Sequence, residues 1–167
     1  MSTILRTAAL SVALIGALSA PTANAATATD TFTVSITVEN SCTIAVNDLN
    51  FGTVNTLATA VNGSTTGTVT CTGIGAYSIA FNAGTGTGST LATRKLANGA
   101  DTIDYNLYSA ANGGGSILGD GTGGTATIGG TSTGAADSFT VYGQVAGGQN
   151  PKPTGTYTSD VVATVTF

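Results

Sequence analysis

Two segments of strict alternation, one near each end of the chain, constrain the fold more than any other feature. In residues 31–38 the apolar side chains recur at every second position, as Phe32, Val34, Ile36 and Val38. In residues 156–167 the same spacing is kept by Val161, Ala163, Val165 and Phe167. A period of two places alternate side chains on one face of a β-strand. The sequence therefore predicts strands at 31–39 and 156–167.

The segment before the first alternation has the pattern of a secretory signal peptide. Arg6 precedes an apolar run at 8–20, and Ala23-Asn24-Ala25 forms an A-x-A cleavage site. The run is shorter than the stretch of about 20 apolar residues that spans a membrane. We therefore expect an exported chain without a membrane span, whose folded part lies within residues 26–167.

The interior of the chain is also predicted to be β-structure, because its apolar residues fall at period two rather than at helical spacing. Further strands are predicted at 42–46, 49–54, 66–71, 76–81, 102–108, 126–128 and 138–145. Three Asn-Gly dipeptides, at 62–63, 98–99 and 112–113, predict hairpin turns, since both residues tolerate a positive φ. The pattern predicts an all-β antiparallel sandwich.

Three other segments are predicted to connect strands. Residues 84–89 and 113–134 are rich in Gly, Ser and Thr, which predicts loops that bury little surface and stay mobile unless a partner covers them. Pro151-Lys152-Pro153 predicts a stiff connection, since proline has no backbone donor for a ladder.

Charge and composition exclude several classes of function. Asp, Glu, Lys and Arg make up 7% of the chain, against about 25% in ordinary globular domains. The formal net charge is −4, and no basic cluster occurs. These properties argue against nucleic acid and anionic lipid as partners.

No catalytic, cofactor-binding or metal-binding residues are predicted. The chain has no histidine, which is the usual general base and a common metal ligand. Lys95 and Lys152 are expected in polar turns, which do not favour a role as a general base. Asp101 and Asp104 are three positions apart, so a strand places them on opposite faces. We therefore expect a protein that is not an enzyme and has no cofactor.

Cys42 and Cys71 are the two cysteines of the chain. In an exported protein a disulfide is the favoured interpretation, and it contributes roughly 3–4 kcal/mol in the chain-entropy model. Two free buried thiols or a metal pair are the alternatives. The metal pair is weak, since the chain offers no histidine or third cysteine as a further ligand.

The 31–39 segment has two interpretations. It is either the first strand of its own sheet or an arm, separated by Asn40-Ser41, that pairs with the sheet edge of another copy. An added strand gains ladder hydrogen bonds and buries its apolar face. An N-terminal donor and an acceptor edge near the C-terminus make a head-to-tail contact, which propagates into a filament unless the rotation closes a ring.

Several motifs, in this order along the chain, resemble one known family. They are Asn40–Ile44, Asn50-Phe51-Gly52, Thr68–Cys71, Tyr105–Tyr108, Phe139–Val145 and 151–167. The combination is similar to the spore coat protein U family, which includes the major subunits of archaic (Csu-type) chaperone–usher pili. The similarity covers residues 30–167.

This resemblance implies an immunoglobulin-like sandwich that is incomplete and is completed by a donated strand. It divides the chain into a signal peptide (1–25), a donor-strand arm (26–40) and a pilin-type domain (41–167). The donor positions it implies are Phe32, Val34, Ile36 and Val38. The acceptor-groove positions are Val161, Ala163, Val165 and Phe167. The disulfide it implies joins Cys42 and Cys71.

The implied partners are a periplasmic chaperone, an outer-membrane usher and further copies of the chain. The implied location is the cell surface, reached through the periplasm, in a pilus that supports adhesion and biofilm formation. Two alternatives remain: a spore-coat or matrix protein of the same fold, and a self-sufficient secreted carbohydrate-binding sandwich. The latter lacks an aromatic platform, because tryptophan is absent and Tyr105 and Leu107 are expected in the core, leaving Tyr108 outward.

Overall fold

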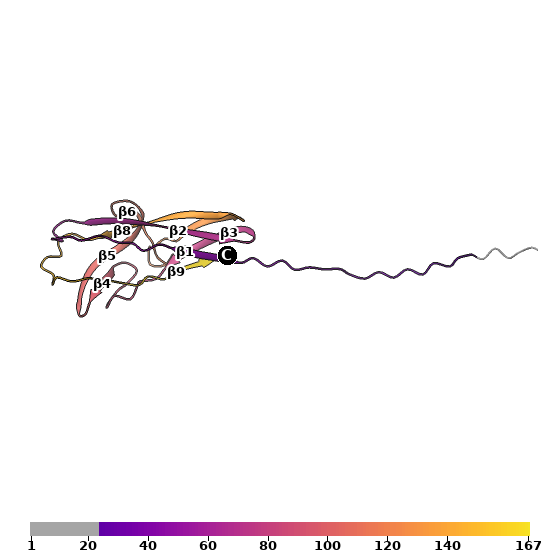
Figure 1. Ribbon diagram of the computed structural model, residues 1–167, viewed down its shortest axis with the longest axis horizontal. Coiled ribbons are helices and arrows are strands. Elements are labelled where there is room, and N and C mark those ends of the chain that lie inside the picture. Colours follow the sequence, from indigo (N-terminus) through magenta and orange to yellow (C-terminus); the bar gives the residue numbers. More distant parts are fainter. Residues whose placement is uncertain (1–23) are drawn as a thin grey trace, which may run out of the picture. The chain divides into compact units, whose positions relative to one another are not determined.

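The computed structural model describes residues 24–167, which form nine β-strands and no helix (Figure 1). The strands are β1 (Cys42–Val46), β2 (Val61–Cys71), β3 (Ile74–Phe81), β4 (Arg94–Asn98), β5 (Asp101–Ala110), β6 (Gly114–Ile117), β7 (Ile128–Thr133), β8 (Ala136–Val145) and β9 (Ala163–Thr166). The predicted all-β class is confirmed. The predicted signal peptide lies almost wholly outside the described residues.

The strands form two antiparallel sheets. The larger has the order β1-β2-β8-β5-β4, with β6 paired to β5, and the smaller has the order β7-β3-β9. Their inner faces enclose one apolar core, whose buried members include Val69, Ile79, Tyr105, Leu118 and Val141. Val69 on β2 and Ile79 on β3 are buried, so both sheets contribute to this core.

One long bent pair of strand paths, β2–β3 against β7–β8, connects the two sheets. β2 passes into β3 across two residues, and β7 passes into β8 across two residues. The β2–β8 ladder reaches Thr70↔Ala136, and the β3–β7 ladder resumes at Ile74↔Thr133. Between these two pairs the β2–β3 side advances four residues and the β8–β7 side advances three. One extra residue on one side is the kind of irregularity that bends a pair of strands. β2 in the larger sheet and β3 in the smaller sheet therefore follow one another along one side of the bent pair, joined by residues 72–73.

A pair of facing glycines makes room for the loop between β1 and β2. Gly63 on β2 lies directly opposite Gly143 on β8. An added Cβ at Gly143 would lie 2.8 Å from both Leu49 Cδ1 and Phe51 Cζ. The side chains of this loop therefore pack where β-carbons would otherwise stand, and the Phe51 ring meets Tyr105 edge-on.

This packing overturns two predictions. Residues 49–54 do not form a strand, because they cross the sheet as a packed loop. Asn62-Gly63 is not a turn but lies inside β2, paired with Gln144 and Gly143. The other two dipeptides are confirmed as turns: Gly99 joins β4 to β5 with φ 59°, and Asn112 and Gly113 join β5 to β6 with φ 58° and 70°.

The prediction of a loop over 113–134 is also wrong, because β6 and β7 lie within this range. Leu118 is fully buried, and the Gly119 carbonyl accepts a hydrogen bond from the Phe81 amide. Glycine-rich strands pair through their backbones, which apolar periodicity does not reveal. The strand predicted at 156–167 shortens to β9, since the preceding residues are held to the 82–85 loop through Asn82, Thr85 and Ser159.

Candidate functional site

Residues 24–41, which include the arm (26–40), belong to no strand, so the strand predicted at 31–39 is not formed. Its four alternating apolar side chains are almost fully exposed: Phe32 85%, Val34 82%, Ile36 88% and Val38 85%. A strand is stable only when its backbone groups find partners. The arm therefore has the side-chain pattern of a strand, but no strand within residues 24–167 pairs with it.

β9 presents an unpaired edge. It pairs with β3 through the register Ser78↔Thr166 to Phe81↔Ala163, and no strand among residues 24–167 pairs with its other edge. Ala163 and Val165 are half-buried and pack against the core, as does Val161 just before the strand. Phe167 is 53% exposed. The apolar face of β9 is therefore only partly covered.

β1 presents a second unpaired edge. It pairs with β2 through Cys42↔Cys71 to Val46↔Gly67, and its other edge has no partner strand within residues 24–167. Ile44 is half-buried against the core, and Val46 is exposed. Cys42 and Cys71 form a disulfide across this ladder, and no free cysteine occurs among the described residues.

The register places both free edges on the same side of the molecule. Residues 67–70 of β2 pair with β8 on one edge and β1 on the other, and residues 78–79 of β3 pair with β7 and β9. Because the β7–β8 side of the ladder is continuous, β1 and β9 follow one another along the opposite side. Both run antiparallel to β2–β3, so they are parallel to each other, with Phe167 directed toward Cys42. β1 and β9 lie close together (Figure 1) without forming a ladder.

This arrangement can bind an extended chain. Free strand edges expose N–H and C=O groups that accept an added strand, and the half-buried face beside them provides apolar contacts for alternate side chains. The four predicted acceptor residues lie at or beside one of these edges, and the four predicted donor residues lie on the exposed arm.

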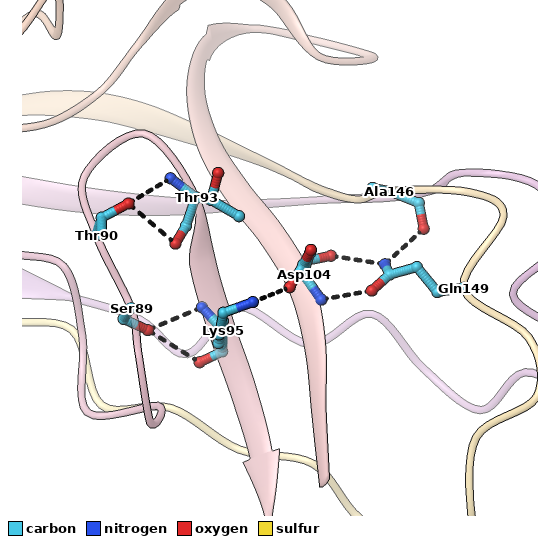
Figure 2. A network of polar contacts seen from close by, with 7 residues as sticks. All are labelled: Ser89, Thr90, Thr93, Lys95, Asp104, Ala146 and Gln149. Atoms are coloured by element: carbon cyan, nitrogen blue, oxygen red, sulfur yellow. Dashed lines mark hydrogen bonds and ion pairs between the residues drawn. The ribbon is translucent and has the colours of Figure 1, made fainter.

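Two of the candidate acid–base residues, Lys95 and Asp104, belong to a polar network that fastens strands and loops together (Figure 2). Lys95 Nζ lies 2.5 Å from Asp104 Oδ1. Gln149 accepts from the Asp104 amide and donates to the carbonyl oxygens of Asp104 and Ala146. Ser89 is bonded to the Lys95 backbone. The predicted turn at Lys95 is wrong, because this residue lies in β4, where its ammonium group pairs with a carboxylate across the ladder.

Arg94 is a buried cation that the sequence patterns did not reveal. It is fully buried and donates to the carbonyl oxygens of Asn82 and Phe81 and to Asn106 Oδ1. Burial lowers the pKa of Arg94, while nearby Tyr105 raises it. Burial raises the pKa of Tyr105, and a hydrogen bond with Ser159 and the charge of Arg94 oppose this rise. The guanidinium group joins the end of β3 to β5, so it ties the two sheets together.

Residues 24–167 contain no cluster of three or more His, Cys, Asp or Glu side chains placed to hold a metal ion. In the same range no helix has the length and apolarity needed to cross a membrane.

Comparisons with known proteins agree with this fold. Residues 28–164 match the Spore Coat Protein U domain. A solved structure also matches: the CsuC–CsuE chaperone–tip adhesion subunit pre-assembly complex from archaic chaperone–usher Csu pili of Acinetobacter baumannii. The match has 19% identity and a TM-score of 0.54, and covers 78% of this chain and 40% of that chain. No curated protein matches. The predicted fold is therefore confirmed: residues 24–167 form an immunoglobulin-like sandwich in which one strand is missing.

Proposed function

The chain belongs to the Spore Coat Protein U domain family, and we propose that it is a structural subunit of a surface pilus assembled by donor-strand exchange. One observation carries the proposal. The chain has an exposed arm with the side-chain pattern of a strand, and also two successive free strand edges beside a partly covered core. The arm has an apolar strand face without a partner strand, and the edges have free backbone groups without an added strand.

The proposed donor residues are Phe32, Val34, Ile36 and Val38. The proposed acceptor is the free edge of β9, with Val161, Ala163, Val165 and Phe167 lining it, continued by the free edge of β1. The arm of one copy enters the edge of the next, so the contact is head-to-tail and extends into a filament.

The size of the apolar contact is sufficient for a durable junction. The four donor side chains are more than four-fifths exposed, so insertion removes nearly all of their surface from water. At about 1.5–3 kcal/mol for each side chain, burial contributes roughly 6–12 kcal/mol as an upper bound. Ladder hydrogen bonds add to this contact.

Assembly by this route requires protection of the free edge before polymerisation. We propose that a periplasmic chaperone covers it and that an outer-membrane usher exchanges the chaperone for the arm of the next subunit. The proposed location is the cell surface, reached by export with residues 1–25 as a signal peptide. The finished filament is proposed to support adhesion and biofilm formation.

The decisive experiment compares two engineered monomers by denaturant unfolding. The first lacks residues 26–40. The second lacks them as well but carries a copy of 29–39 after Phe167 on a short flexible linker. A cooperative transition with a large gain in midpoint for the second monomer only is the expected result. Equal stability of both monomers would refute the proposal and favour the self-sufficient binding sandwich.

Two variants test the assigned residues separately. Ile36→Asp places a carboxylate on the buried face of the inserted arm, so it should prevent polymerisation while leaving the chaperone-bound subunit intact. Thr33→Asp, on the opposite face of the arm, is the matched control and should polymerise. Removal of Thr166 and Phe167 should abolish capture by the chaperone. Normal filaments from Ile36→Asp would contradict the donor assignment, and an unchanged chaperone complex after the truncation would contradict the acceptor assignment.

Spore-coat or matrix assembly of the same fold is separated from a pilus by the product. Electron microscopy of the producing cells should show thin surface filaments that disappear when the gene is deleted.

A further inference from the structure

The arm joins the domain through a dense set of contacts around one bend. Asn40 Oδ1 accepts hydrogen bonds from the Gly73 amide at 2.8 Å and from the Ser41 amide at 3.0 Å. The Ser41 amide also lies 3.0 Å from Thr72 Oγ1, and the Thr72 amide donates to the Ser41 carbonyl at 2.8 Å. These contacts extend the β1–β2 pairing beyond Cys42↔Cys71 to Ser41 and to Asn40, the last residue of the arm.

Gly73 is part of this fit. A Cβ at position 73 would lie 2.8 Å from Asn40 Oδ1 and 3.1 Å from Asn40 Cγ. Any side chain there would push the Asn40 amide away from the bend. The absence of a Cβ thus allows Asn40 to hold the point at which β2 becomes β3.

The disulfide determines where tension on the arm enters the domain. It joins Cys42, the first residue of β1, to Cys71, the last residue of β2. Residues 43–70 lie inside the covalent loop, so a pull on the arm passes from Cys42 directly to Cys71. From Cys71 the backbone continues without a break to Ser78, where pairing with β9 begins.

We propose that Asn40, Ser41 and Cys42, together with Cys71, Thr72 and Gly73, form a clamp that passes tension from the arm into β2–β3 and leaves β1 unloaded. This clamp rests on the proposed function in one respect, namely that a neighbouring subunit holds the arm. In a filament β2 and β3, joined by residues 72–73, then receive tension from the arm through the disulfide and deliver it to β9, beside which the next arm is held. Without the disulfide, this tension would pass only through the hydrogen bonds of Asn40 and Ser41 and the five-residue ladder of β1.

Single-molecule pulling along two axes tests the clamp on the full chain. The first axis has handles at Ala28, on the arm, and Ala100, in the β4–β5 turn. The second has handles at Ala100 and Ala111, at the two ends of β5, and does not pass through the disulfide. Each axis is measured for the oxidised protein and for the Cys42→Ser/Cys71→Ser double variant.

The expected result is a loss of unfolding force in the double variant that is larger on the arm axis than on the β5 axis. A disulfide that only stabilises the fold lowers the force similarly on both axes, and that outcome would overturn the clamp, as would an unchanged force on the arm axis. On the arm axis, opening the loop of sequence separation 29 should also lengthen the unfolding step by about 100 Å, at about 3.5 Å per residue. This increment verifies the redox state of each molecule.

Two further measurements keep the test valid if the double variant does not fold or if donor-strand exchange is wrong. Reduction of the oxidised protein while it is held at low force replaces the double variant if that variant does not fold. Repeating both axes with an excess of the peptide 29–39 shows whether filling the free edge matters. If the peptide does not bind, donor-strand exchange is contradicted, but the comparison of the two axes still decides the clamp.

Discussion

Gly67 lies at the most crowded point of the β1–β2–β8 ladder, and the Gly67→Ala variant tests how tightly this region is packed. Its direct partners are Val46 on β1 and Phe139 on β8. A Cβ at this position would lie 2.7 Å from the Ala45 carbonyl oxygen and 2.9 Å from Phe139 Cε1. Both distances are shorter than real Cβ contacts, so a neighbour must move. The Phe139 ring occupies the space that the glycine leaves.

Gly75→Ala supplies the matched control. Gly75 also lies inside a strand, β3, and a Cβ there would meet nothing within 4 Å. Both substitutions reduce the entropy of the unfolded chain, by about 0.4–1 kcal/mol. This contribution cancels in the difference between the variants, which leaves the overpacking cost of about 1–3 kcal/mol. Because one of the neighbours is a backbone oxygen, we expect about 2–3 kcal/mol, the upper part of that range.

Equilibrium unfolding in urea, followed by tyrosine fluorescence and circular dichroism, measures this difference directly. The midpoint of Gly67→Ala should fall below that of the parent protein, and the midpoint of Gly75→Ala should equal or exceed it. The slope should stay the same for all three proteins, since the surface exposed on unfolding is unchanged. Equal midpoints for the two variants would show that Phe139 and β1 yield without cost, and would refute the packing argument.

Three further predictions concern the core, the disulfide and the arm root. Burial raises the pKa of Tyr105 above its ordinary value of about 10, so the stability that its neutral form provides is complete below about pH 10 and is lost as the pH rises through the folded-state pKa. Tyr105→Phe should reduce this alkaline loss in unfolding experiments, and an identical pH profile would contradict the assignment. Reduction of Cys42–Cys71 should lower the free energy of unfolding by about 3.6 kcal/mol for a loop of separation 29; two free thiols in the mass spectrum of secreted protein would exclude the bond. Asn40→Ala should accelerate hydrogen exchange at the Gly73 amide, with the Thr158 amide, bonded to Ala97, as the unchanged reference.

The strands that the sequence predicted well are those whose inner face meets the core. In β3, β5 and β8 the apolar residues alternate because every second side chain is buried, as with Tyr105 and Leu107. Tyr108, expected to face outward, is half-buried. Alternation is a record of burial on one face, so it finds strands that have such a face.

The strands that the sequence did not predict lack an alternation of apolar side chains. β4 contains Arg94, whose buried position is that of a core residue although its side chain is charged. β6 and β7 are rich in glycine and threonine, and they are held mainly by backbone pairing. A periodicity of apolar side chains does not reveal either arrangement.

Asn-Gly dipeptides carry two different kinds of information, and the local sequence does not separate them. At 98–99 and 112–113 glycine supplies the positive φ that a turn requires. At 62–63 the glycine has no β-carbon, and this leaves room for Phe51, which comes from another segment of the chain. Only the position of that segment distinguishes these roles, and it is a property of the tertiary structure.

The same limit applies to the arm and to the free edges of β9 and β1. Period-two alternation specifies a strand and its apolar face, but it does not name the strand that pairs with it. Residues 31–39 have the alternation without a partner in the described chain, and β9 and β1 have free edges without an added strand. Each of these would be costly in isolation, because one exposes apolar side chains and the other exposes backbone groups. If an arm from another copy occupies the edges, one contact removes both costs, and this is the physical reason to expect the two features in one chain.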